Sequence, residues 1–137
     1  MDETSMASCS TARGRLVENH DSAIVLGLGG TDYQLCLAVA SPVRGEIGKS
    51  VAGRILAKAK RVDVVRTGGR YIEPIYGRPR RLQGRIVQLD FTANTLTVQT
   101  ACPFICKLTV GQRASDFDIS QFVAFDIESN VRFEPMN

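Results

Sequence analysis

The sequence contains no apolar stretch long enough to cross a membrane. Its longest apolar segment, residues 23–30, falls far short of the roughly 18 uncharged residues that a membrane-spanning helix requires. The first residues also lack the basic region followed by an apolar segment that is typical of an export signal. We therefore expect a cytoplasmic protein with no membrane partner.

Histidine is almost absent, since His20, in a polar stretch near the N-terminus, is the single imidazole of the chain. A structural zinc site needs about four nitrogen or sulfur ligands, and a nucleophilic cysteine needs a nearby base. Asp126 and Glu128 alternate outward along an expected strand, which is typical of a solvated face and not of a hydrolytic acid pair. The sequence thus predicts a protein that is not an enzyme and has no metal and no cofactor.

The chain has four cysteines, which would be an even set for disulfides in a secreted protein. Without an export signal, and with enough apolar residues for a core, we expect them to be reduced. Cys102 and Cys106 lie four residues apart in an expected strand, or about 13 Å at 3.3 Å per residue, which fits neither a disulfide nor a shared metal. We interpret Cys9, Cys36, Cys102 and Cys106 as buried, unreactive thiols.

The sequence does contain enough apolar material for one packed domain. Its 137 residues are 44% hydrophobic and 23% charged, which is typical of a globular chain of one-domain length. Residues 1–21 are polar and have no hydrophobic period, so we expect a disordered N-terminal tail. Residues 22–137 are then a single folded domain.

Alternating apolar residues separated by turn signals predict several short strands. Residues 23–28 and 33–40 flank the turn residues 29–32, and this pattern predicts a hairpin. A second hairpin is expected from residues 82–91 and 96–100. Further strands are expected at 121–127, at 131–133 and at 104–110, where Phe104, Cys106, Leu108 and Val110 would share one face.

The segment 49–61 fits two kinds of secondary structure. As a strand, it places Val51, Gly53, Ile55, Ala57 and Ala59 on one face. As a helix from residue 50 to 61, it also forms an apolar stripe, but the glycine inside it would cost about 1 kcal/mol relative to alanine. We favour a long strand with a bulge at residues 60–61 and keep the helix as the alternative.

These elements together predict an all-β protein with at most one short helix. The expected fold is a small, mostly antiparallel barrel of five to eight strands, similar to oligonucleotide/oligosaccharide-binding (OB) barrels, or a two-sheet sandwich. The chain shows no repeat at a fixed period, which excludes solenoids and propellers.

The positive charge is concentrated in the middle of the chain. Residues 1–43 carry two basic and five acidic side chains, residues 44–85 carry twelve and three, and residues 86–137 carry three and six, so the three parts have net charges of −3, +9 and −3. Within the middle part, arginines alternate with tyrosines and glycines. Arginine donates to phosphate oxygens, and tyrosine offers a ring on which an unstacked base can stack.

The sequence therefore predicts a non-catalytic binding module for a polyanion, with single-stranded nucleic acid as the leading ligand. A solvated, ligand-free loop is the competing interpretation of the same residues. A protein partner at residues 72–76 is a further alternative. The residues expected to bind nucleic acid or another anion are Arg66, Arg70, Tyr71, Tyr76, Arg78, Arg80, Arg81 and Arg85.

Two segments resemble known families. Arg81 to Arg85 fits the RxxxR element of PilZ domains, small β-barrels that bind a cyclic dinucleotide, and 90–94 loosely resembles their DxSxxG element, with Thr92 in place of serine and Thr95 in place of glycine. That resemblance implies arginines holding a dinucleotide at a barrel mouth. Residues 61–87 resemble a segment of a family of small, β-barrel-like planctomycete proteins, which implies no catalytic role for any residue here.

Overall fold

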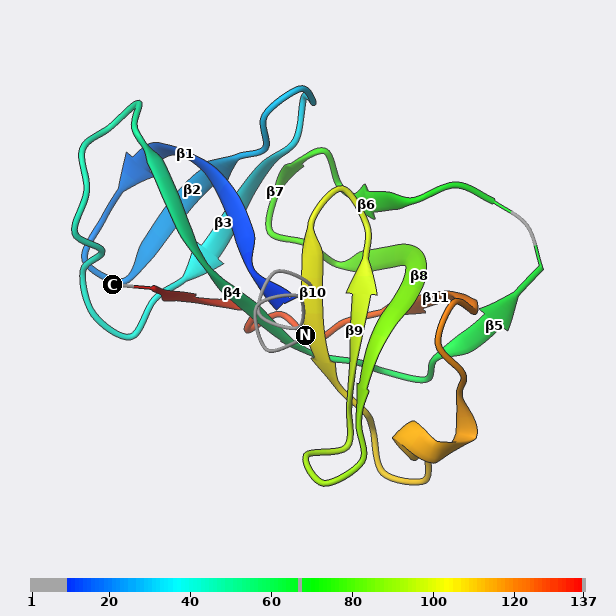
Figure 1. The fold of residues 1–137 in the computed structure, drawn as a ribbon. Helices are drawn as coiled ribbons and strands as arrows, with labels where there is room; N and C mark the ends of the chain where they lie inside the picture. Colours follow the sequence, from blue (N-terminus) through cyan, green and yellow to red (C-terminus); the bar gives the residue numbers. More distant parts are fainter. Residues whose placement is uncertain (1–9, 67, 137) are drawn as a thin grey trace, which may run out of the picture.

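A computed structural model describes residues 10–66 and 68–136. Within these ranges the chain is all-β, with twelve strands and one 3-10 turn, η1 (Ala114–Asp116), which confirms the predicted fold class (Figure 1). The strands are β1 (Ala12–Asn19), β2 (Ala23–Gly27), β3 (Gln34–Ala38), β4 (Ser50–Lys58), β5 (Asp63–Val65), β6 (Tyr71–Glu73), β7 (Tyr76–Gly77), β8 (Arg81–Asp90), β9 (Thr95–Gln99), β10 (Pro103–Lys107), β11 (Phe122–Asp126) and β12 (Arg132–Pro135).

Strands from distant parts of the chain close a five-stranded barrel, which we call the first ring. Its order is β1-β2-β3-β12-β4, and β4 returns to pair with β1. All pairs in this ring are antiparallel except β3 and β12, which are parallel. The expected hairpin of residues 23–28 and 33–40 is present as β2 and β3.

A second ring of strands lies beside the first, and the two share β4. Its order is β4-β10-β9-β8-β11, where β4 and β10 are parallel. A bridge between Ala59 and Ile127 joins β11 back to the end of β4, and the Lys60 N–H donates to the Asp126 carbonyl at 2.9 Å beside it. Figure 1 shows β4 running from the first ring into the second.

The strand interpretation of residues 50–58 is correct, and the burial pattern explains why. Gly53, Ile55 and Ala57 are buried while Arg54 and Lys58 are exposed, so the side chains alternate with the period of a strand. The strand ends at Lys58, close to the expected bulge, and β5 is a separate strand that pairs with β11. Gly53, the glycine that would weaken a helix, lies where β4 is paired on both sides, with β1 and with β12.

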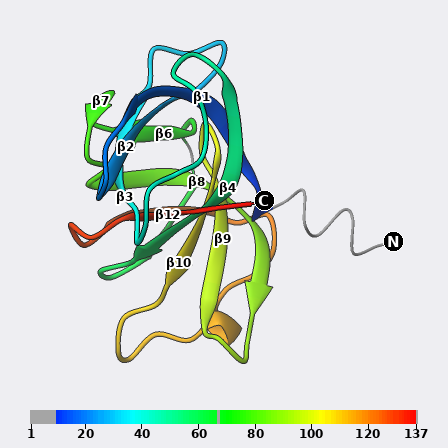
Figure 2. The ribbon, with the colours of Figure 1, turned by 90° about the vertical axis from the view of Figure 1, so that its left-hand side faces the viewer.

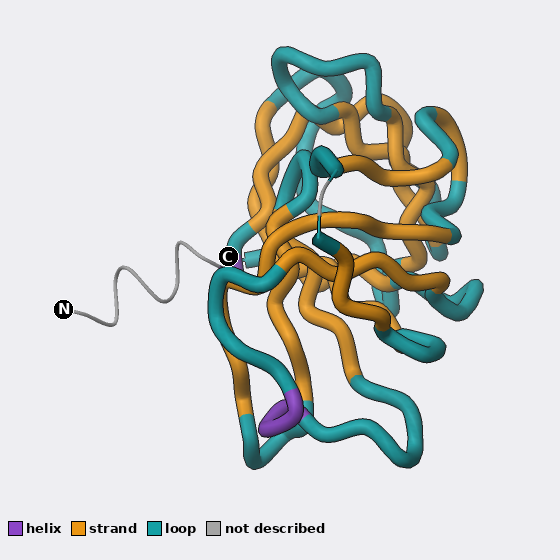
Figure 3. Tube along the Cα trace, turned by 90° about the vertical axis from the view of Figure 1, so that its right-hand side faces the viewer, coloured by secondary structure: helices purple, strands orange, loops and turns teal. Residues whose placement is uncertain are grey.

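One apolar core fills both rings. The buried cluster extends from Ala12 in β1 to Phe133 in β12 and includes Phe104 and Phe125 of the second ring. In Figure 2, β12 crosses β4 near the junction of the two rings. Figure 3 shows η1 at the end of the second ring that is remote from the first ring.

The segment 71–77 connects the two rings. β6 pairs with β8 of the second ring, and β7 pairs with β3 of the first. The peptide bond between Glu73 and Pro74 is cis and lies between the two short strands. The Gln34 N–H also donates to the Ile75 carbonyl at 2.9 Å.

Two expectations are corrected by the structure. Residues 12–19 form β1, so the expected disordered tail of residues 1–21 is wrong for this part, whereas residues 1–9 lie outside the described residues. The alternation in β1 is weak because Arg13 and Arg15 face outward while the inward residues include Gly14, which hides the period of the strand. Val110 is fully exposed in a turn and does not share the buried face of Phe104 and Cys106.

Candidate functional site

The eight predicted anion-binding residues do not form one continuous site. Arg66 and Arg70 are exposed in the connection between β5 and β6, Tyr71 lies in β6, and Arg85 lies in the middle of β8. The structure brings Arg78, Arg80 and Arg81 together along one depression of about 660 Å³, and Tyr71 contacts Arg81.

Arg81 already has partners within the protein. Its guanidinium Nη1 lies 3.1 Å from Oδ1 of Asp126, its register partner across β8 and β11. Hydrogen bonds to Asp126 and to Tyr71 raise the pKa of Arg81 above its ordinary value. A phosphate would have to compete with Asp126 for this guanidinium.

Arg85 also interacts within the second ring. Its guanidinium carbon lies 5.0 Å from the centre of the Phe122 ring, a cation–π arrangement with its register partner in β11. In the same part of β8, the Gln83 side-chain amide is buried and donates to the Gly69 carbonyl at 3.0 Å. The hydrogen bond from Gln83 holds the 68–70 loop against β8.

The depression that contains Arg78, Arg80 and Arg81 is mixed in charge. Lys60 adds a fourth cation, and the carboxylates of Glu73, Asp126 and Glu128 line the same depression, so its net charge is only +1. Among the described residues, no carboxylate lies within ion-pair distance of Arg78 or Arg80. Lys60 also has no such partner there, so Arg78, Arg80 and Lys60 are the cations of the depression that can bind an external anion.

Tyr76 is the exposed aromatic residue of the predicted set. It is 63% exposed on β7, whereas Tyr71 is half-buried and engaged by Arg81. Arg78 follows two residues later and also lines a hollow of about 380 Å³ with Cys36 and Ser129. A ring for stacking and two guanidinium groups that have no ion partner in the described part of the chain therefore lie within five residues of one another.

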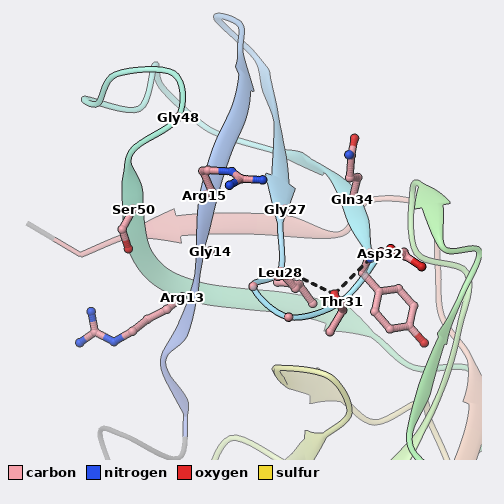
Figure 4. A pocket seen from close by; sticks show the side chains of 13 residues that line it. Arg13, Gly14, Arg15, Gly27, Leu28, Thr31, Asp32, Gln34, Gly48 and Ser50 are labelled. Atoms are coloured by element: carbon pink, nitrogen blue, oxygen red, sulfur yellow. Dashed lines mark hydrogen bonds between the residues drawn. The ribbon is translucent and has the colours of Figure 1, made fainter.

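A second depression, of about 540 Å³, lies on the first ring and is lined by residues outside the set predicted from the sequence (Figure 4). Arg13 and Arg15 of β1 line it together with Gly27, Gln34 and the turn 28–32. The turn is held by the Thr31 hydroxyl, which donates to the Leu28 carbonyl at 2.8 Å and accepts from the Tyr33 N–H at 3.1 Å. Both arginines belong to the tail expected to be disordered, and the only sequence signal for them is their two-residue spacing.

Two of the three thiols in the described part of the chain are buried, whereas Cys36 is half-buried, which corrects the expectation for that residue. Cys36, Cys102 and Cys106 are free, and Cys9 lies outside the described residues. Burial raises the pKa of Cys102 to about 12 and raises that of Cys106 as well. In residues 10–66 and 68–136, no three His, Cys, Asp or Glu side chains are grouped in a way that could hold a metal ion.

The two elements that resemble PilZ motifs lie at opposite ends of β8. Arg81 begins the strand and Asp90 ends it, so they are separated by about 30 Å at 3.3 Å per residue. Arg85 does not line the depression that contains Arg81. This arrangement does not bring the two elements to one barrel mouth.

Comparison with known proteins gives no relative from which a function could be transferred. No protein-family model, curated protein or solved structure matches the chain. Over residues 10–66 and 68–136, no helix has the length and hydropathy of a membrane span.

Proposed function

We propose that this protein binds single-stranded nucleic acid through Tyr76, Arg78 and Arg80. The observation that carries the proposal is an exposed tyrosine ring beside two arginines that have no ion partner among the described residues. Arginine neutralises phosphate and releases counterions, while a tyrosine ring contributes about 1–3 kcal/mol by stacking on a base.

The fold of the first ring supports the same ligand class. We infer that this five-stranded ring is an OB-like barrel, because a meander of three antiparallel strands is completed by β4, the next strand in the chain, and by β12, which returns from far along the chain. Barrels of this type present curved strand faces to oligonucleotides. Tyr76 lies on β7, directly beside β3 of this ring.

The test is a titration of fluorescently labelled single-stranded and duplex oligonucleotides at two salt concentrations. We expect wild type to prefer the single strand, because only unpaired bases can stack on Tyr76. Tyr76→Ala should lower the affinity about tenfold and remove the strand preference. Arg78→Ala/Arg80→Ala should lower the salt slope by about 1.4, or about 0.7 for each phosphate that is no longer neutralised.

A charge-matched control comes from the pair of strands β4 and β10. Lys58 and Lys107 are exposed register partners on β4 and β10, and they line a separate small hollow. Lys58→Ala/Lys107→Ala removes the same charge as the arginine double variant and should leave the strand preference unchanged. Absence of binding by wild type at low salt, where a positive surface attracts phosphate most strongly, would refute the proposal.

A protein partner at residues 72–76 is the second candidate, because Ile75 and Tyr76 are both exposed there. The backbone of the segment is already paired with β8 and β3, so a partner would bind through side chains and not by adding a strand. Light scattering that detects a dimer lost in Ile75→Asp but retained in Arg78→Ala/Arg80→Ala would favour this candidate over nucleic acid.

A further inference from the structure

The depression on the first ring and the Tyr76 segment are neighbours in the same sheet. Gln34 lines the depression, and it is the parallel register partner of Tyr76. Both side chains face outward, because the adjacent pair, Leu35 and Gly77, lies on the inner side, where Leu35 is fully buried. No other strand therefore separates the depression from Tyr76.

Register positions define a row across the outer face of the first ring. Ser50 pairs with Arg15, Arg15 with Gly27, and Gly27 with Gln34, which in turn pairs with Tyr76. Neighbouring strands lie about 4.8 Å apart, so Arg15 and Tyr76 are about 14 Å apart across three strand spacings. One extended ligand can contact both residues.

Gly27, in the middle of this row, has no side chain that could protrude from the outer face. It lies between Arg15 and Gln34, where any other residue would raise a side chain between the arginine and the tyrosine. A Cβ atom at this position would lie 3.1 Å from a methyl carbon of Val17. Figure 4 shows the Arg15 side chain extending over β2 toward Gly27. The floor of the depression is thus backbone, which lets a ligand approach closely.

The other end of the row continues toward Arg80. Arg78 lines a hollow together with Cys36, which is the next outward residue of β3 after Gln34. Arg78 also lines the depression that contains Arg80, and Ser129 lines both hollows. Tyr76 and Arg80 are four residues apart and so are separated by at most about 14 Å. The full row from Arg15 to Arg80 therefore spans at most about 28 Å.

The charges at the β1 end favour an anion. Among the described residues, neither Arg13 nor Arg15 has a carboxylate within ion-pair distance. Asp32 also lines the depression, but it lies in the turn at the end opposite Arg13 (Figure 4). Phosphates are thus attracted to the β1 side.

We propose that Arg13, Arg15, Gly27 and Gln34 form the second half of one binding track, along which a single strand crosses from the depression of the first ring past Tyr76 to Arg78 and Arg80. This inference rests on the proposed function and adds the path and length of the ligand. A track of this length fits the low end of the range of about 4–16 nucleotides that single-strand-binding folds cover.

The experiment compares a short oligonucleotide of about two nucleotides, which is about half the length that the whole track fits, with a longer one of about twelve. The short strand fits on Tyr76, Arg78 and Arg80, whereas the long one also reaches β1. Arg13→Ala/Arg15→Ala should weaken binding of the long strand at least about tenfold and lower its salt slope by about 1.4. The same variant should leave binding of the short strand unchanged.

Three further variants sharpen the test. Gly27→Leu adds a side chain to the floor without changing charge and should also weaken only the long strand. Asp32→Asn removes the carboxylate from the depression and should strengthen binding of the long strand. Lys58→Ala/Lys107→Ala is the charge-matched control and should not distinguish the two lengths. Thermal unfolding by circular dichroism verifies that each variant is folded, and the arginine variant decides the question if Gly27→Leu does not fold.

The outcomes separate this inference from the proposed function. If wild type binds neither strand, the proposed function itself is wrong. If wild type binds both strands but the Arg13→Ala/Arg15→Ala variant behaves as wild type at both lengths, only the extension is wrong. An equal loss of affinity for both lengths also overturns the track, because it would show a general charge effect and not binding at one end.

Discussion

The hydroxyl oxygen of Tyr33 accepts a hydrogen bond of 3.1 Å from the backbone N–H of Ile72, 39 residues along the chain. Tyr33 directly precedes β3 of the first ring, and Ile72 belongs to β6, which pairs with the second ring. The bond therefore fixes the position of the segment that carries Tyr76 relative to both rings.

Removing this hydroxyl should destabilise the protein. In Tyr33→Phe, the N–H of the buried Ile72 loses its partner, at a cost of about 1–3 kcal/mol in the free energy of unfolding, measured with urea. Tyr76→Phe is the matched control, since Tyr76 is exposed, and it should leave the stability within about 0.5 kcal/mol. Equal effects of the two variants would contradict a structural role for the Tyr33 hydroxyl.

Gly53 lies where β4 is crowded by β12. A Cβ atom at this position would overlap the Glu134 carbonyl oxygen and lie 2.6 Å from the Phe133 ring. Because one of these is a backbone atom, Gly53→Ala should lower the free energy of unfolding by about 1–3 kcal/mol or more. Gly29→Ala meets nothing within 4 Å and should be close to neutral. A tolerated alanine at residue 53 would show that β12 does not pack as described.

The buried thiols make stability depend on alkaline pH. Burial raises the pKa of Cys102 from 9.0 to about 12, so the folded state holds this proton while the unfolded state releases it. The contribution of the buried, protonated thiol to the free energy of unfolding is complete below about pH 9. It is lost as pH rises toward 12, at about 1.4 kcal/mol per pH unit for each thiol. Urea unfolding from pH 8 to 10 should show a shallower fall in Cys102→Ala than in wild type. Parallel curves would mean that Cys102 is accessible to solvent.

Releasing Arg81 from its carboxylate partner should strengthen anion binding. Asp126→Asn removes the charge that holds the Arg81 guanidinium, and the salt slope for a single-stranded oligonucleotide should rise by about 0.7. Asp63→Asn removes the partner of Arg61, whose ion pair lies outside the binding depression, and should change the slope less. A larger effect at Asp63 would place the ligand on the β5 side of the second ring.

Much of the fold could be predicted because hydrophobic alternation and turns are local signals. The β2–β3 and β8–β9 hairpins each have turn residues between two apolar runs, and the structure contains both. The sequence favours a strand over a helix at 50–58 because Gly53 would weaken a helix, and the structure confirms the strand. β1 is not predictable in this way because two arginines and a glycine leave few apolar residues from which a period could be recognised.

The site is less predictable because its geometry depends on pairing between distant strands. The sequence places Arg81 and Arg85 together with Arg78, but Asp126 and Phe122 of β11 engage them. Similarly, the sequence separates Arg15 from Tyr76 by 61 positions, whereas β2 and β3 bring both residues to one face. No local pattern contains either relationship.

The sharing of β4 has a consequence for the order of assembly. The strands between β4 and β12 in the chain belong to the second ring or its connections, so the first ring is complete only when β12 lies between β3 and β4. The Arg54 and Glu134 side chains that meet across the β4–β12 pair are 80 residues apart in the chain. During synthesis, the first four strands therefore leave the ribosome before the strand that joins β3 to β4. The positions of β3 and β4 that pair with β12 stay unpaired until the second ring and then β12 have been made.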